Sequence, residues 1–182
     1  MQTQSDTAGF GPRAIIVMGV SGSGKSTLGA ELARALGCRF LEGDSFHDAA
    51  AVAKMRAGIP LDDADRWPWL DRLGAGIREA VLADGVAVAA CSALKQSYRE
   101  RLAGATGLPV AFILPEASRE ELVHRMNNRP GHYMPASLLD SQLATLEQPE
   151  AGEPVLVLDG ARPLDELREA SLDWLRRTDT PR

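Results

Sequence analysis

The sequence is short of the residues that mark several classes of protein. Only two of its 182 residues are cysteines, and their number and spacing suggest neither a metal site nor a disulfide scaffold, which favours a reducing compartment. No run approaches the ~18 apolar residues that a membrane span needs. The net charge of −5 leaves no basic excess for nucleic acid or an anionic membrane surface. We therefore expect a cytoplasmic protein that binds neither of them.

The two ends of the chain differ in composition from its middle. The first residues, MQTQSDTAGFG, are polar and glycine-bearing and contain no apolar core of the signal-peptide kind. The last residues, RRTDTPR, are also polar. We expect flexible tails at 1–12 and 178–182 around one domain at 13–177, which is long enough to bury a sizeable core.

Short apolar runs alternate with longer segments of helical periodicity. The runs are apolar at successive positions, as in strands covered on both faces, and they span residues 14–18, 39–42, 86–91, 110–114 and 155–159. Helical patterns span residues 26–36, 68–83 and 163–177, and another follows a capping box formed by Ser118 and Glu121. Pro68 suits the first turn of its helix. The alternation predicts an α/β fold with a parallel five-stranded sheet and helices on both faces.

One loop carries a specific phosphate-binding pattern. Gly19, Gly24, Lys25 and Ser26 match G-x-x-x-x-G-K-[ST] between an apolar strand and an amphipathic helix. Glycines let successive backbone N–H groups turn toward one anion, and the helix adds its positive N-terminal end. Lys25 should reach the β- and γ-phosphates, and the Ser26 hydroxyl should ligate Mg²⁺. The pattern predicts a P-loop NTPase fold that binds a nucleoside triphosphate with magnesium through Gly19, Val20, Ser21, Gly22, Ser23, Gly24, Lys25, Ser26 and Thr27.

A phosphate-binding loop is compatible with a small-molecule kinase, a GTPase switch or a partner-coupled ATPase. The guanine-reading tetrapeptide Asn-Lys-x-Asp does not occur, which argues against a GTPase. The apolar strand VLVLDG comes near the end of the chain, where it should close the sheet. Two excursions interrupt the alternation, an insertion at about 44–69 and a lid at about 126–149, and such excursions often form substrate sites. We favour a small-molecule kinase.

The insertion contains candidates for the acceptor side of the site. Asp44 follows the second strand, where a carboxylate could accept the proton of an attacking hydroxyl, although a turn or cap aspartate is the alternative. Glu42 could hold Mg²⁺ through water. Cations in a chain that is acidic overall suggest an anionic acceptor, although solvated charges are the alternative, and the candidates are His47, Lys54, Arg66, Lys95 and Arg99. For Trp67 and Trp69 we favour packing onto the core over stacking on a sugar.

Several segments together resemble the gluconate kinase (gluconokinase) family. They are MGVSGSGKST, GDSFH, KMRAGIPLDDADRWPWL, CSALKQSYR and SQLATLEQP, and the resemblance runs from about residue 13 to residue 159. That family consists of small P-loop kinases similar in fold to shikimate and adenylate kinases. The resemblance implies transfer of a phosphoryl group from ATP to D-gluconate, giving 6-phospho-D-gluconate, with Lys25 and Asp44 as catalytic residues.

The resemblance also implies which residues bind each substrate. Arg125 and Arg129 match lid arginines that close over the triphosphate. The sugar acid would be bound by Asp44, His47, Lys54, Arg66, Lys95, Arg99, His132 and Gln142. The chain departs from the family pattern at Glu42, Asp48, Ala51 and Tyr133, where the family usually has Asp, Pro, Asn and Phe.

Two other functions stay open at this point. A shikimate kinase-like enzyme would use another small anionic alcohol, but that family has a Gly-Gly-Gly turn where this chain has CSALK. A nucleotide-binding module with weak ATPase activity would have no small acceptor. The segment LLDSQLATL has helical spacing and suits either lid packing or a homodimer surface.

Overall fold

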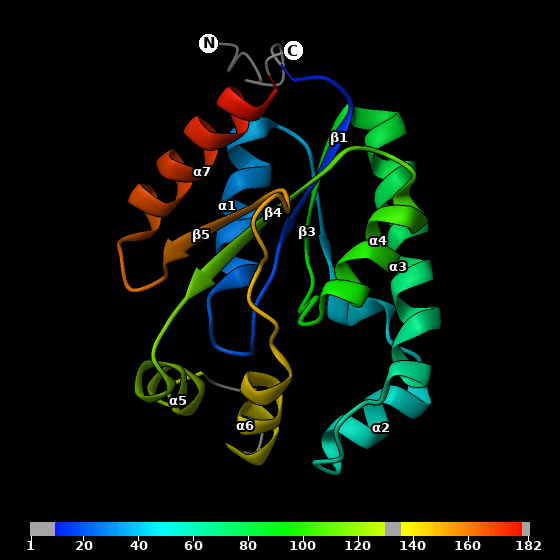
Figure 1. Ribbon diagram of the computed structural model, residues 1–182, viewed down its shortest axis with the longest axis vertical. Coiled ribbons are helices and arrows are strands. Elements are labelled where there is room, and N and C mark those ends of the chain that lie inside the picture. The colour runs from blue at the N-terminus through cyan, green and yellow to red at the C-terminus, as the bar shows by residue number, and fades with distance from the viewer. Residues whose placement is uncertain (1–9, 130–135, 180–182) are drawn as a thin grey trace.

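Five strands form one parallel sheet at the centre of the molecule (Figure 1), as the sequence predicts. The computed structural model describes residues 10–129 and 136–179. The strands are β1 (Arg13–Val17), β2 (Arg39–Glu42), β3 (Val86–Ala90), β4 (Val110–Glu116) and β5 (Val155–Asp159). Their order in the sheet is β2-β3-β1-β4-β5, so β1 lies between β3 and β4. The strand that leads into the phosphate-binding loop is therefore the central one.

Helices cover both faces of the sheet, which explains the unbroken apolar runs of β1 and β3. Every residue of these two strands is buried. The helices α1 (Lys25–Leu36) and α7 (Leu164–Thr178) pack on one face, and α3 (Asp63–Asp84) and α4 (Gln96–Thr106) pack on the other (Figure 1). Successive strand residues alternate between the two cores, with Ile15 on the α1 side and Ile16 on the α3 side.

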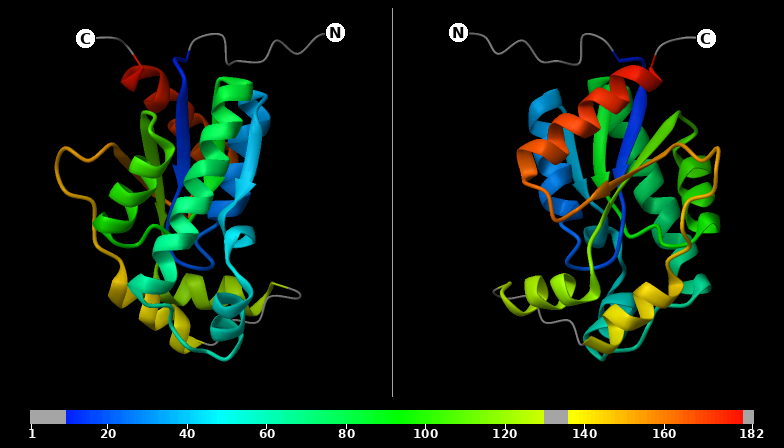
Figure 2. Two further views of the ribbon diagram at one scale, coloured as in Figure 1. Left: turned by 90° about the vertical axis from the view of Figure 1, so that its right-hand side faces the viewer. Right: turned by 60° about the vertical axis from the view of Figure 1, so that its left-hand side comes forward.

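Three shorter helices lie beyond the carboxyl ends of the strands. They are α2 (Ala49–Arg56), α5 (Arg119–Asn127) and α6 (Ala136–Thr145), and the start of β1 and the end of α7 lie at the opposite end of the molecule (Figures 1 and 2). In parallel α/β sheets the ligand binds at the carboxyl ends of the strands. Among the described helices, none is both long enough and apolar enough to cross a membrane.

The start of α3 differs from the sequence-based prediction. The helix begins at Asp63 rather than at Pro68, which lies inside it. Asp62 caps the helix by accepting from the Asp65 N–H at 2.8 Å, and the Asp65 side chain accepts from the Asp62 N–H at 3.0 Å. This reciprocal capping box fixes the first turn and offsets the hydrogen bond that Pro68 cannot donate. The last part of the predicted insertion, residues 63–69, therefore belongs to α3.

Candidate active site

The phosphate-binding loop joins β1 to α1 and has the backbone conformation that its glycines allow. Gly19, Gly22 and Gly24 have φ angles of 135°, 80° and 84°, in the region that favours glycine. A Cβ atom at Gly22 would lie 3.1 Å from the Leu122 carbonyl oxygen, because α5 packs directly on the loop. Helix α1 begins at Lys25, so its N-terminal N–H groups face the same space.

One cavity of about 170 Å³ lies along this loop. It is lined by Gly22, Gly24, Lys25, Ser26, Thr27, Arg125 and Arg129. Arg125 donates to the carbonyl oxygens of Gly22 at 3.3 Å and Gly160 at 2.9 Å, so it links the loop to the segment after β5. This cavity brings together both predicted lid arginines and much of the predicted nucleotide site. The other predicted nucleotide contacts, Gly19, Val20, Ser21 and Ser23, do not line it.

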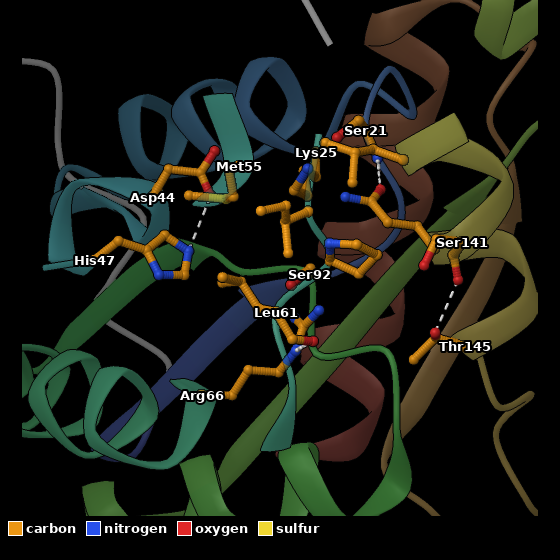
Figure 3. Close-up of a pocket in the computed structure, with 14 residues that line it drawn as sticks. Ser21, Lys25, Asp44, His47, Met55, Leu61, Arg66, Ser92, Ser141 and Thr145 are labelled. Carbon is orange, nitrogen blue, oxygen red and sulfur yellow. Dashed lines mark hydrogen bonds and ion pairs between the residues drawn. The ribbon is translucent and has the colours of Figure 1, made fainter. Parts of the chain in front are cut away.

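A second cavity, of about 120 Å³, adjoins the other side of Lys25 (Figure 3). Its 14 lining residues come from the phosphate-binding loop and the start of α1, from a short 3-10 helix η2 (Gly43–Phe46) and the residue after it, and from α2, α3 and the connection between them. The others come from the loop after β3 and from α6. Among them are the predicted site residues Lys25, Asp44, His47, Arg66 and Gln142. Lys25 lines both cavities.

Asp44 and His47 lie side by side in this second cavity (Figure 3). The Asp44 side chain is 67% exposed, whereas the His47 side chain is 3% exposed and stacks on Trp69 with ring centroids 4.1 Å apart. His47 Nε2 lies 4.0 Å from Asp44 Oδ1. Burial lowers the pKa of His47, so the imidazole is neutral near pH 7. Trp69 is buried against the core, as the sequence predicts, and its ring holds His47 beside Asp44.

Two of the predicted substrate cations are paired with aspartates of the first turn of α3. Lys54 Nζ lies 2.9 Å and 2.8 Å from the two carboxylate oxygens of Asp65, and Lys95 Nζ lies 3.1 Å from Asp63 Oδ1. Hydrogen bonds from Tyr98 and, with a smaller effect, from Lys95 lower the pKa of Asp63. The hydrogen bond with Asp65 raises the pKa of Lys54. Neither lysine lines the second cavity, which is called the acceptor-side cavity from here on because it contains Asp44, the predicted base for the acceptor.

Two further predicted cations, Arg66 and Arg99, are placed very differently. Arg99 is buried in an ion pair with Glu153 and lies outside the cavity. Arg66 lines the cavity, and its guanidinium lies 5.1 Å from the centroid of the Tyr98 ring. Its Nε donates to the Leu61 carbonyl oxygen over a long 3.4 Å. Arg66 is therefore the predicted acceptor-side cation that the structure brings to Asp44.

The segment predicted to form a lid contributes a contact to the phosphate-binding loop. The backbone N–H of Ser21 donates to Gln142 Oε1 of α6 at 2.8 Å (Figure 3). Gln142 thus connects α6 to the loop at the edge of the second cavity. His132 falls outside the described residues, so its predicted role stays a prediction.

Ser26 and Glu42 form a pair whose chemistry fits Mg²⁺. Ser26 Oγ donates to Glu42 Oε2 at 2.6 Å, and the other carboxylate oxygen, Oε1, is buried with no hydrogen-bond partner among the described residues. A buried carboxylate oxygen without a partner is costly, and a cation or an ordered water removes that cost. Mg²⁺ takes oxygen ligands, commonly one or two carboxylates together with substrate phosphates. The residues present therefore fit the ion.

Several lining residues of the second cavity were not singled out from the sequence. They are Met55, Ile59, Pro60, Leu61, Ser92, Leu138, Ser141 and Thr145. Ser92 is the second residue after β3, and a polar residue soon after a buried parallel strand is a usable signal for a site residue. Ser141 and Thr145 lie within the SQLATLEQP segment on α6, one turn apart.

Comparison with known proteins assigns the chain to a family. A family model described as an AAA domain matches residues 15–149. A gluconokinase of Gluconobacter oxydans (strain 621H) is 51% identical over 161 residues, which cover 88% of this chain and 90% of that protein. The chain belongs to the gluconokinase family.

Other gluconokinases agree in sequence and in fold. The thermosensitive gluconokinase of Escherichia coli (strain K12) is 41% identical over 145 residues, covering 79% of this chain and 76% of that protein. The crystal structure of a gluconokinase from Sinorhizobium meliloti 1021 superposes with a TM-score of 0.81 at 43% identity, over 92% of this chain and 94% of that one. The resemblance read from the motifs and the P-loop kinase fold are both confirmed.

Proposed function

We propose that this protein transfers the γ-phosphoryl group of ATP to the 6-hydroxyl of D-gluconate, giving ADP and 6-phospho-D-gluconate. The observation that carries the proposal is the position of Lys25 between the two cavities. A phosphoryl group that moves from a nucleotide in the first cavity to an alcohol in the second must pass this ammonium group. The names of the relatives support gluconate as the alcohol.

The nucleotide side acts by position and charge. Phosphoryl transfer needs little covalent participation from the protein, because most of the catalysis lies in alignment and electrostatic stabilisation. Backbone N–H groups of the loop would bind the phosphates, and Lys25 would stabilise the charge that develops between the β- and γ-phosphates. Arg125 and Arg129 line the same cavity and would add positive charge along the triphosphate.

Ser26 and Glu42 would hold Mg²⁺. When bound, the ion neutralises phosphate charge and orients the β- and γ-oxygens. Glu42 is one methylene longer than the Asp that is usual in the family, and its carboxylate contacts Ser26 directly.

Asp44 would accept the proton of the attacking hydroxyl. Its carboxylate lies in the same cavity as Lys25, so an alcohol bound there can face both the base and the γ-phosphate. The neutral His47 beside it adds no competing positive charge near pH 7. Such a base typically contributes about 10²–10⁴ in rate.

Arg66 would bind the carboxylate of gluconate. A guanidinium matches a carboxylate with two parallel hydrogen bonds, and within residues 10–129 and 136–179 that of Arg66 makes one long hydrogen bond, to the Leu61 carbonyl oxygen, beside its contact with the Tyr98 ring. Lys54 and Lys95 would not contact the gluconate carboxylate directly, because each lysine is already paired with an aspartate, Asp65 and Asp63 respectively. Of the four predicted carboxylate-binding cations, we propose Arg66 as the one that contacts the acid.

A cytoplasmic location is part of the proposal. Cys38 and Cys91 are both free thiols, and burial raises the pKa of Cys38 to about 11 and that of Cys91 to about 12. Thiols with such high pKa values stay protonated and react slowly with oxidants. Free thiols and the use of ATP suit a reducing compartment.

The test is ADP release from ATP and Mg²⁺, first alone and then with gluconate, shikimate or nucleoside monophosphates added. We expect release to depend on gluconate and the product to be 6-phospho-D-gluconate. ADP release that is equally fast without any acceptor would indicate an ATPase module instead. Release with shikimate but not with gluconate would refute the assigned substrate.

A further inference from the structure

Helix α3 presents one row of side chains to η2, the short helix that carries Asp44. Trp69 Nε1 donates to the Gly43 carbonyl oxygen at 2.8 Å. One turn later, Arg72 donates to the Phe46 carbonyl oxygen through Nε at 3.1 Å and Nη2 at 2.9 Å. Positions three residues apart share a helix face. The two ends of η2 are therefore bound to a single face of α3.

Two glycines let η2 sit close to its neighbours. A Cβ atom at Gly43 would lie 2.2 Å from the Ala90 carbonyl oxygen, at the end of β3. A Cβ atom at Gly76, on the same face of α3 as Arg72, would lie 3.0 Å from the Phe46 ring. The short helix η2 therefore packs closely against the end of β3 and against α3. A shift of α3 would move η2 with it.

Trp69 makes a second contact with the same region. Its ring stacks on His47 with an interplanar angle of 20°, and His47 faces Asp44. Trp69 thereby contacts both the residue before Asp44 and the histidine three residues after it. Neither Trp69 nor Arg72 lines the acceptor-side cavity, so any effect on the reaction must act through these neighbours.

We infer that Trp69 and Arg72 are positioning residues, which hold Asp44 where it can accept the proton of the attacking hydroxyl. The inference rests on the proposed role of Asp44. Proton transfer and in-line attack depend steeply on geometry, and a misplacement of about 1 Å can cost about a hundredfold in rate. The guanidinium of Arg72 and the indole of Trp69 limit such movement of η2 by binding its two terminal carbonyl groups.

The first test is Arg72→Met, with Arg78→Met as the matched control. Arg78 lies on the same helix and also donates to a backbone carbonyl, that of Thr106 at 3.0 Å, away from η2. We expect kcat of Arg72→Met to fall roughly tenfold, with the KM for ATP unchanged, and Arg78→Met to keep the wild-type kcat. Arg72→Lys, which retains one donor, should recover part of the loss. An equal loss of kcat in the Arg72 and Arg78 variants would overturn the inference.

The second test is a double-mutant cycle with Asp44→Asn. If Arg72 acts through Asp44, Arg72→Met should cost less than about twofold in the Asp44→Asn background, because the group that it positions is gone. A full tenfold loss in that background would overturn the positioning role alone. Near-normal kcat for Asp44→Asn by itself would overturn the proposed base as well, so the two failures can be distinguished.

Trp69→Phe gives a third measurement. Phenylalanine keeps a ring beside His47 but lacks the N–H that binds Gly43. We expect a lower kcat with a nearly unchanged KM for gluconate, whereas Trp67→Phe should leave kcat as it is, because Trp67 packs edge-on against Tyr98 away from η2. A wild-type kcat for folded Trp69→Phe would contradict the inference. Should this core variant fail to fold, the Arg72 series decides.

Discussion

Arg99 and Glu153 form a two-pronged ion pair, with Nε to Oε2 at 2.8 Å and Nη2 to Oε1 at 3.1 Å. The Arg99 side chain is only 2% exposed, and its Nη1 also donates to the carbonyl oxygens of Ala93 and Leu94. The hydrogen bond from Arg99 lowers the pKa of Glu153. The pair ties α4 to the segment before β5, and the Nη1 hydrogen bonds bind the same side chain to the loop after β3.

Arg99→Met should therefore destabilise the protein rather than weaken gluconate binding. Removing one partner of a buried ion pair leaves the other uncompensated, and we expect a loss of about 3 kcal/mol in the free energy of unfolding, measured with urea. Arg101→Met is the control, because its pair with Asp71 is about half exposed and should contribute far less to stability than a buried pair. Wild-type stability together with a raised KM for gluconate would contradict this prediction and would indicate that Arg99 binds the substrate.

Arg66→Met should remove the preference for a sugar acid over a neutral sugar. A desolvated cation without its partner costs about 2–5 kcal/mol, so gluconate should exceed glucose in kcat/KM by about thirtyfold to several thousandfold in the wild type. The variant should lose most of that ratio. Lys54→Met and Lys95→Met are the controls, and their losses should be smaller because each lysine faces an aspartate. A ratio that survives in Arg66→Met would place the carboxylate elsewhere.

Glu42→Gln should raise the Mg²⁺ concentration that gives half-maximal rate. An amide oxygen is a weaker ligand than a carboxylate, and we expect an increase of about tenfold, within the range seen when residues around a metal are changed. The measurement is a Mg²⁺ titration of ADP formation at fixed ATP. Glu31→Gln is the control, because Glu31 is paired with Arg34 and Arg168 away from the site. An unchanged Mg²⁺ dependence of the rate would show that Glu42 does not help to bind the metal.

His47 should make the protein less stable in mild acid. Burial, helped by Arg66 and Arg72 and opposed by Asp44 and Asp48, lowers its pKa in the folded state below the value of about 6.5 in the unfolded chain. As the pH falls through about 6.5, the unfolded chain binds a proton that the folded protein excludes. The free energy of unfolding then falls by up to about 1.4 kcal/mol per pH unit, until the folded pKa is reached.

The measurement is urea denaturation between about pH 7.5 and about pH 5.5. His47→Gln should show a smaller loss over this range than the wild type. His124→Gln, which replaces an exposed histidine on α5, should behave like the wild type. Equal slopes for the His47 variant and the wild type would show that the buried imidazole does not titrate in this way.

The strands and the phosphate-binding loop were predictable because their signals are local. A strand buried on both faces must be apolar at nearly every position, as β1 and β3 are. The loop needs glycines at fixed spacing for its positive φ angles. The start of α3 was missed because proline is favoured at the first position of a helix, whereas the capping box of Asp62 and Asp65 lacks the usual Ser or Thr with Glu.

The partners of the charged residues could not be read from the sequence. The pairs Lys54–Asp65 and Lys95–Asp63 join residues 11 and 32 positions apart, and both depend on how α3 packs against its neighbours. Arg99 meets Glu153 across 54 positions. Sequence patterns show that charges are present, but only the packed structure decides whether a cation faces a carboxylate of the protein or of a ligand.

The two cavities share Lys25 but differ in most of the rest of their lining. The nucleotide side uses Gly22, residues 24–27 and two arginines at or just after the end of α5, whereas Asp44, His47 and Arg66 of the other side come from one continuous segment. Substitutions confined to residues 44–66 can thus alter the choice of alcohol while the machinery for ATP is inherited unchanged. Residues 44–66 are therefore the first unit to exchange when a new acceptor is to be engineered, with Ser92 and the α6 side of the cavity as the fixed surroundings that the exchanged segment must fit.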